Sequence, residues 1–317
     1  MKIFTTYDEQ ISILKSRHLI IEDENMLMQQ LEDIGYYNLI NGYSFIFKDK
    51  DDNYIQNASS NDIISLYNFD KSLRTIVYKY ALKVESKFKS LISYIFSNHH
   101  GVDEKLYLLR ENFDKDIEKE SNIIRLINNL NELITESKDK NSSKWKRYIS
   151  HYAENHGHVP FWVLVRAMTF GDISIFYANM ILSEKTEIAN KFNLSPSQLE
   201  SMLKSLVQFR NTVAHDERIF CKKINRNYLT TKLPVYDLMR IPRSQTGTPY
   251  SGINDFLSLM IIFKYLLSPL DFADFWLEFT TERDILIKNI KSHFVSTINN
   301  EMGLKNRWKN LQNYKPQ

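Results

Sequence analysis

The feature that most limits the fold of this chain is a helical pattern of apolar residues, which begins at Ser60 and continues for about 38 residues. His99, His100 and Gly101 end the run. Its apolar positions recur every three or four residues, as on one face of a long helix. Gly and Pro number only 8 and 7 among 317 residues. Because this scarcity argues against a turn-rich β-sandwich or barrel, the sequence predicts an all-α fold.

Shorter stretches of helical periodicity flank this run on both sides. The expected helices cover residues 6–15, 23–34, 121–137, 145–152, 160–168, 173–182, 255–267 and 271–298. Asp23 has the side chain of a helix N-cap, and Gly171 is expected to break the chain between two of these helices. An acidic turn at residues 50–53 separates two short stretches, 44–47 and 53–55, which favour at most one small β-hairpin.

One helix start is signalled more strongly than the others. Ser195 can cap the helix, Pro196 suits its first position, and Gln198 can complete a capping box. The apolar stripe that follows consists of Leu199, Met202, Leu203, Leu206, Val207 and Val213. This helix is therefore expected to extend to the segment that contains Arg210 and His215.

Three segments describe the organisation of the chain. Residues 1–59 form an N-terminal helical and aromatic segment, residues 60–225 a helical core, and residues 226–317 a basic loop followed by C-terminal helices. No repeat or low-complexity linker separates them, so one integrated globular unit is expected. Residues 242–252, rich in Pro, Ser, Thr and Gly, are the best candidate for a mobile loop.

Composition excludes several classes of protein. The single Cys221 cannot form an intramolecular disulfide and suits a reducing cytoplasm. The first ten residues include two acids and no long apolar run, so they do not resemble a signal peptide. Charged residues and a proline interrupt the most hydrophobic window, residues 256–277, which therefore predicts buried helices and no membrane span.

A candidate catalytic motif stands at the end of the helix that Ser195 begins. Arg210 and His215 are five positions apart, and Asn211 directly follows the arginine. Histidine can move a proton near neutral pH, while arginine is a permanent cation that can neutralise charge on a phosphate. An ideal helix places the two side chains roughly 140° apart. A shared phosphate therefore requires that the arginine bends over or that the helix loosens near His215.

The bare spacing of this motif is weak evidence. With 13 arginines and 8 histidines in the chain, a histidine five to seven positions after an arginine is expected roughly once by chance. Requiring asparagine directly after the arginine lowers this to roughly 0.1. The alternative interpretation is a histidine favoured by the helix dipole, with a surface arginine beside it.

A strongly basic segment follows the motif, although the chain as a whole carries only +3. Residues 218–243 contain seven basic residues and one acid, a net charge of +6. The candidate RNA-binding residues are Arg218, Lys222, Lys223, Arg226 and Lys232. The alternative is a solvated loop whose charges pair with the acidic residues 111–120.

Other polar and aromatic groups have ordinary explanations. The cluster of His151, His156 and His158 lacks the carboxylate or cysteine that would complete a metal site. Three tyrosines in the stretch 35–43 could stack on bases, but core packing is the simpler interpretation: Tyr36, Tyr37 and Tyr43. Glu85 lies among lysines, and pairing within its own helix explains it.

Four segments in the same order resemble a known family. They are residues 34–43 with their aromatic and glycine motif, residues 66–74 followed by Val84-Glu85, residues 160–174, and residues 210–220. Over residues 5–225 the chain resembles bacterial abortive-infection (Abi) proteins of the AbiD/AbiF type. The stretch Arg210–His215 is similar to the arginine–histidine signature of HEPN-superfamily ribonucleases, which also occurs in the HEPN parts of CRISPR type VI effectors.

The resemblance implies a HEPN-like helical bundle with N- and C-terminal helical extensions, and a role in phage defence or a toxin–antitoxin pair. The CRISPR effectors bring two arginine–histidine motifs together in one chain, whereas this chain has one. Either two chains meet in a homodimer and build a composite site, or the protein binds RNA and cuts poorly.

The expected chemistry is metal-independent cleavage of RNA without a cofactor. His215 acts as general base or general acid, Arg210 neutralises the phosphorane-like charge, and Asn211 orients the histidine or holds a phosphate oxygen. The products are a 2′,3′-cyclic phosphate and a 5′-OH. A non-catalytic protein that binds a small structured RNA, and a helical protein-interaction module, are the alternatives.

Overall fold

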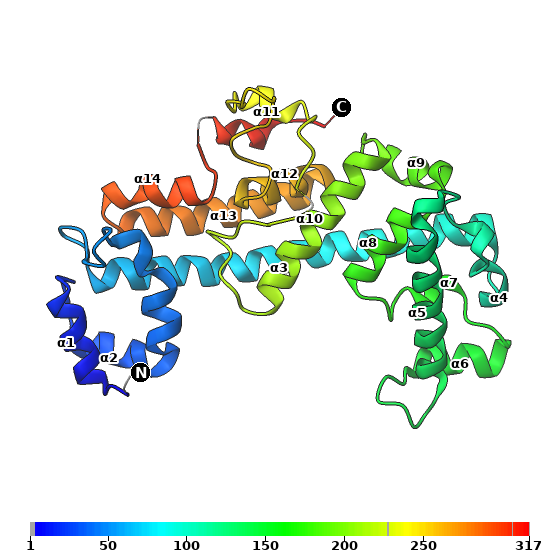
Figure 1. Ribbon diagram of the computed structural model, residues 1–317, viewed down its shortest axis with the longest axis horizontal. Helices are drawn as coiled ribbons and strands as arrows, with labels where there is room; N and C mark the ends of the chain where they lie inside the picture. Colours follow the sequence, from blue (N-terminus) through cyan, green and yellow to red (C-terminus); the bar gives the residue numbers. More distant parts are fainter. Residues whose placement is uncertain (1–3, 227, 306, 317) are drawn as a thin grey trace.

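The computed structural model describes residues 4–226, 228–305 and 307–316. Its central element is α3 (Ser60–His100), a helix of 41 residues about which the other helices are arranged (Figure 1). Ser59 and Asp62 form a capping box at its start, and Gly101 ends it with a positive φ of 77°. At 1.5 Å per residue, α3 is about 60 Å long. The predicted long helix is therefore confirmed.

The described residues form helices and contain isolated β-bridges but no β-sheet, so the predicted all-α fold is also confirmed. Besides α3, the longer helices are α1 (Tyr7–Ser16), α2 (Glu24–Ile34), α5 (Glu120–Lys138), α6 (Arg147–His156), α8 (Phe170–Asn179), α9 (Leu182–Asn190), α10 (Pro196–Ala214), α12 (Phe256–Leu266), α13 (Pro269–Asn289) and α14 (Ser292–Glu301). The short ones are η1 (Tyr37–Asn41), η2 (Ser44–Phe47), α4 (Glu104–Tyr107), η3 (Arg110–Asn112), η4 (Ile117–Lys119), α7 (Phe161–Leu164), α11 (Val235–Leu238) and η5 (Trp308–Asn313). None of the described helices is both long enough and apolar enough to cross a bilayer.

The C-terminal helices pack along the first half of α3. Helix α13 runs antiparallel to it, since Lys79 pairs with Glu278 at 2.6 Å and Lys83 pairs with Asp271. The expected single helix over residues 271–298 is wrong, because the chain becomes extended at Ile290 between α13 and α14. Asp62 of α3 accepts the backbone N–H of the next residue there, at 3.1 Å.

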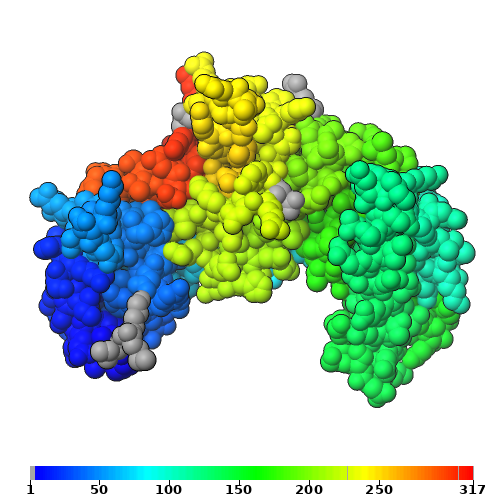
Figure 2. All heavy atoms as spheres, in the orientation of Figure 1, coloured from blue at the N-terminus to red at the C-terminus, as the bar shows by residue number. Residues whose placement is uncertain are grey.

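The second half of α3 carries a separate group of helices, α4 to α9. Phe96 of α3 is fully buried in an aromatic cluster whose other members come from four different segments: Tyr107, Phe113, Phe161 and Phe176. Figure 2 shows that this group and the N-terminal helices project from the same side of the molecule, with a hollow between them. Helix α10 crosses α3 between the two, and its C-terminal end carries the candidate motif (Figure 1).

The strong cap signals are confirmed. Ser195 accepts the backbone N–H of Gln198, and the Gln198 side chain accepts the backbone N–H of Ser195, so α10 begins with a complete capping box. Asp23 caps α2 with a single hydrogen bond, which its side chain accepts from the backbone N–H of Met26. These signals are reliable because cap and partner lie three residues apart.

The structure reduces one local expectation to its lower limit and contradicts another. Residues 44–47 form the 3₁₀ turn η2, and the expected hairpin is reduced to a single antiparallel bridge between Lys48 and Tyr54. Ile46 and Phe47 are both buried, whereas a half-buried strand would bury every second side chain. Gly171 does not break the chain, because Thr169 and Asp172 form a capping box that places the glycine in the first turn of α8.

Candidate functional site

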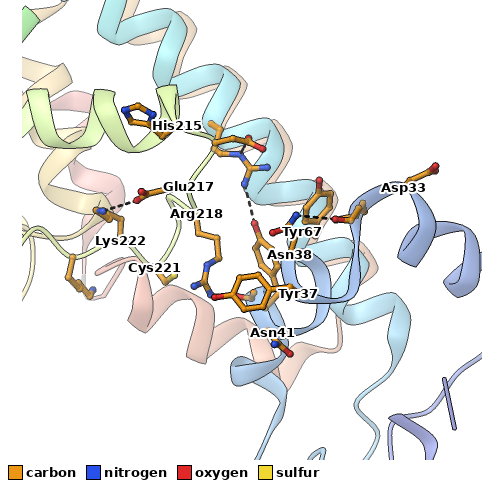
Figure 3. Close-up of a pocket in the computed structure, with 16 residues that line it drawn as sticks. Asp33, Tyr37, Asn38, Asn41, Tyr67, His215, Glu217, Arg218, Cys221 and Lys222 are labelled. Carbon is orange, nitrogen blue, oxygen red and sulfur yellow. Dashed lines mark hydrogen bonds and ion pairs between the residues drawn. The ribbon is translucent and has the colours of Figure 1, made fainter. Parts of the chain in front are cut away.

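The described residues surround a pocket of about 790 Å³ at the C-terminal end of α10 (Figure 3). One wall comes from η1 and the end of α2, with Tyr37, Asn38 and Asn41. The other wall comes from the turn that follows α10, with His215 and Arg218. The N-terminal segment and the motif, far apart in the sequence, therefore meet at one site.

His215 is the C-cap residue of α10. Its backbone N–H donates to the carbonyl of Asn211 at 3.1 Å, which closes the last turn of the helix. The side chain is exposed and lines the pocket, and no other described residue forms a hydrogen bond with its ring. Both ring nitrogens are therefore available to a ligand.

Arg210 lies elsewhere. Helix α10 keeps its α-helical geometry to Ala214, so it does not loosen near His215, and the arginine does not bend over into the pocket. Its Nε is 3.6 Å from Oε2 of Glu85, and its guanidinium lies 5.8 Å from the ring centre of Tyr78. Its side chain remains 24% exposed. In one chain, the histidine of the motif faces the pocket and the arginine faces α3.

Asn211 is exposed and contacts the arginine. Its Oδ1 accepts a long hydrogen bond of 3.4 Å from the Arg210 guanidinium. Glu85 forms the expected pair within its own helix, with Lys89 at 2.9 Å, and also faces Arg210.

Three of the five candidate RNA-binding residues line the pocket. Arg218 donates to the carbonyl of Gly42 across the pocket and lies 6.0 Å from the ring centre of Phe45. Lys222 pairs with Glu217 at 3.2 Å (Figure 3). Lys223 donates to a backbone carbonyl of α14 at 2.5 Å. The pocket wall beside His215 therefore holds more cations than carboxylates: Arg74, Arg218, Lys222 and Lys223 against Asp216 and Glu217.

The other two candidates lie outside this pocket. Arg226 is exposed, and Lys232 lines a different pocket beside the C-terminal segment. The alternative that acidic residues 111–120 neutralise the basic segment does not match the pairs found among the described residues. Asp114 pairs with Lys119 of the same region, and Glu120 pairs with Arg110, which directly precedes that region.

A buried network of polar groups, not expected from the sequence, supports the turn after His215. The Asp70 side chain of α3 is 0% exposed. Its Oδ1 accepts the backbone N–H groups of Ile219 and Phe220, at 3.0 and 2.7 Å. Its Oδ2 accepts from the Tyr43 hydroxyl at 2.8 Å and from Arg74 at 2.7 Å. Burial raises the pKa of Asp70, and these hydrogen bonds oppose that shift.

This network also reaches the pocket surface. Arg74 lines the pocket, and its Nε lies 2.8 Å from a carboxylate oxygen of the exposed Asp216, next to His215 in the chain. The turn that follows His215 is therefore held to α3 by an ion pair and by two hydrogen bonds from its backbone. Apart from the Asp70–Arg74 pair within α3, each of these groups comes from a segment distant in sequence from its partner, so no local pattern predicts the whole network.

The three tyrosines of the N-terminal motif differ in their surroundings. Tyr43 is 2% exposed and belongs to the core and to the Asp70 network, as expected. Tyr37 is 77% exposed and lines the pocket, so core packing does not explain it. Tyr36 is half-buried.

Other reactive groups are less suited to chemistry. Burial raises the pKa of the Cys221 thiol to about 11, so near neutral pH this pocket residue is protonated and a poor nucleophile. His151 contacts Asn155 at 2.7 Å, and His158 contacts the carbonyl of His156 at 2.8 Å. In the described part of the chain, no three His, Cys, Asp or Glu side chains are grouped so that they could bind a metal ion.

Comparison with protein families matches residues 29–221 to the model of the Abi-like protein family, which is more than half of the chain. The chain belongs to the Abi-like protein family. No curated protein and no solved structure matches it. The matched region of this Abi-like protein begins within α2 and ends at Cys221, so it includes all of α3 and α10 and every residue that lines the pocket except Lys222 and Lys223. The family suggests a role in abortive infection, a defence against phage.

Proposed function

We propose that this Abi-like protein binds RNA and that its pocket is a metal-independent endoribonuclease site of the HEPN type. One observation carries the proposal: an exposed histidine without a described hydrogen-bond partner lines a pocket together with Arg218, Lys222 and Lys223. With Arg74 these cations outnumber the carboxylates of Asp216 and Glu217, so the wall keeps a net positive charge that attracts a phosphodiester, and histidine provides the proton transfer.

In the proposed reaction, the ribose 2′-oxygen attacks the adjacent phosphorus and the bond to the 5′-oxygen breaks. His215 accepts the proton of the 2′-OH or donates a proton to the leaving 5′-oxygen, a step that contributes about 10²–10⁴-fold to the rate. Arg210 stabilises the charge that develops on phosphate, and loss of such a group costs roughly 10²–10³-fold. Asn211 orients His215 or holds a phosphate oxygen. DNA lacks the attacking hydroxyl.

The placement of Arg210 supports a composite site in a homodimer. Within one chain this arginine lies against Glu85 and does not line the pocket that contains His215. In-line transfer benefits from one group at the attacking oxygen and a second at the leaving oxygen, and one chain offers a single motif histidine. Two chains that present this end of α10 to each other would provide two histidines and two arginines.

The activity is tested by incubating purified protein with mixed RNA in the presence of EDTA and mapping the ends of the fragments. We expect fragments that carry 2′,3′-cyclic phosphate and 5′-OH ends, and an intact DNA strand of the same sequence. Cleavage that requires a divalent ion, or fragments with 3′-OH ends, would contradict this chemistry.

The composite site is tested by mixing two inactive chains. His215→Ala and Arg210→Ala homodimers are each expected to be inactive, and their heterodimer should recover part of the activity. Full activity of a dilute wild-type protein that is demonstrably monomeric would refute the composite site.

A second candidate function is storage or sensing of a small structured RNA without cleavage, as in a toxin–antitoxin pair. The same placement of Arg210 favours it, because one chain's pocket holds the motif histidine without the motif arginine. Co-purified RNA, measured as absorbance at 260 relative to 280 nm and then sequenced, together with no cleavage by the dimer, would support this function over catalysis.

A further inference from the structure

The pocket has two chemically different walls. The wall beside His215 carries more cations than carboxylates, whereas the η1 wall carries the exposed ring of Tyr37 and the exposed amides of Asn38 and Asn41 (Figure 3). Phosphate contacts account for only the first wall. A ring face and amide groups are what proteins use to bind the face and the edge of an unpaired base.

The backbone of η1 presents these three side chains. Residues Tyr37–Asn41 form a π-helix, a rare conformation that often marks functional sites. Leu39 and Ile40 are buried within it and fix it to the core, so that Tyr37, Asn38 and Asn41 remain exposed. The Asn38 amide nitrogen donates to the carbonyl of Ile34 at 3.1 Å, which leaves its oxygen as an acceptor. For Asn41, no side-chain hydrogen bond to another described residue is present.

Arg218 connects the two walls. Its guanidinium donates to the carbonyl of Gly42, directly after η1, although the residue itself belongs to the turn beyond α10. A nucleotide held at this position would therefore have a cation within reach of its phosphate and Tyr37 within reach of its base. The pocket volume of about 790 Å³ lies within the range of about 300–1,000 Å³ that is common for small-ligand sites.

We propose that the η1 wall is a base-binding subsite, in which one unpaired RNA base stacks on Tyr37 and is contacted at its edge by Asn38 and Asn41. The proposal rests on the proposed function, since the phosphate of the same nucleotide is placed on the cationic wall. It adds the substrate class: single-stranded or looped RNA. A base inside a duplex is covered on both faces by its neighbours and cannot stack on the tyrosine.

The test is a binding measurement in the His215→Ala background, so that the RNA is not cut. Fluorescence anisotropy would compare a short single-stranded oligoribonucleotide with a duplex of the same sequence. Tyr37→Ala should weaken single-strand binding by roughly 5- to 150-fold, the effect of losing one stacked base, and Tyr37→Phe should retain it. Tyr94→Ala is the matched control, because Tyr94 is 73% exposed, lies in the second half of α3 and does not line the pocket.

The outcomes separate the subsite from the proposed function. If single-stranded RNA binds and Tyr37→Ala binds it as tightly as the control does, the base-binding subsite is refuted and the RNA-binding function stands. An equal loss for duplex and single strand would also refute the claim for an unpaired base. If neither RNA binds at low salt, both proposals fail together.

Discussion

Replacing Asp70 by asparagine should destabilise the protein strongly, because it breaks a buried ion pair. The Asp70 side chain is fully buried and accepts four hydrogen bonds, two of them from backbone N–H groups of the turn after His215. Asparagine has almost the same shape. Its carbonyl oxygen can still accept the backbone N–H groups of Ile219 and Phe220, but the amide nitrogen that replaces Oδ2 cannot accept from Tyr43 or Arg74, so the substitution removes the charge and these two hydrogen bonds.

The size of the effect follows from the burial of the pair. The side chains of Asp70 and Arg74 are 0% and 7% exposed. Removing one partner of a buried ion pair costs about 3–5 kcal/mol, because the other charge remains buried without compensation. Arg74 keeps a second partner in Asp216, but this carboxylate is 87% exposed and contributes only about 0–1 kcal/mol. We expect a loss of ~3 kcal/mol or more in the free energy of unfolding.

Urea denaturation followed by circular dichroism measures this loss. Asp284→Asn, at an exposed position of α13, is the matched control and should stay within about 0.5 kcal/mol of the wild type. Asp70→Ala should be worse than Asp70→Asn, since it also leaves two backbone N–H groups unpaired, at about 1–3 kcal/mol each. A loss below about 1 kcal/mol for Asp70→Asn would refute the role of this carboxylate as the anchor of the turn.

Three further outcomes follow from the structure. Burial raises the pKa of Glu184 from 4.5 to about 7. Between these two pH values the folded state therefore retains a proton that the unfolded chain releases. The contribution of this proton to stability is therefore present at low pH and is lost as pH rises through about 7. In urea titrations, the free energy of unfolding of the wild type should fall by ~1–3 kcal/mol relative to that of Glu184→Gln between pH 5 and pH 8. Ser195→Ala removes the N-cap of α10 and should lower the free energy of unfolding by about 0.5–2 kcal/mol in the same assay. No change would mean that the capping box does not stabilise the folded protein. Charge reversal of Lys222 and Lys223 should weaken RNA binding for all sequences alike. It should also reduce the slope of log affinity against log salt by about 1 for each lost phosphate contact. An unchanged slope would remove these lysines from the binding surface.

The sequence predicts the helices best where the signals are local. The start of α10 was predictable because the capping box spans four residues, and α3 because its apolar pattern continues over about ten turns. The break between α13 and α14 was not, since it depends on Asp62, which is far away in the sequence and accepts a backbone N–H there.

The candidate site shows the same division. His215 and three of the basic residues were identified from the sequence and line one pocket. The position of Arg210 was not predictable, because Glu85 and Tyr78 of another helix determine where its side chain lies. The Asp70 network joins residues between 27 and 150 positions apart, together with one contact within α3, and only the folded chain brings those distant partners together.

The most direct test of the central claim is the single-turnover rate of RNA cleavage in EDTA by the wild type and by His215→Ala. His158→Ala is the matched control, since that histidine lies outside the pocket. We expect His215→Ala to lower the rate by about 10²–10⁴-fold while the control cleaves normally, with affinity for uncut RNA retained in both. Cleavage by His215→Ala at the wild-type rate would contradict catalysis at this site and leave RNA binding as the function of the pocket.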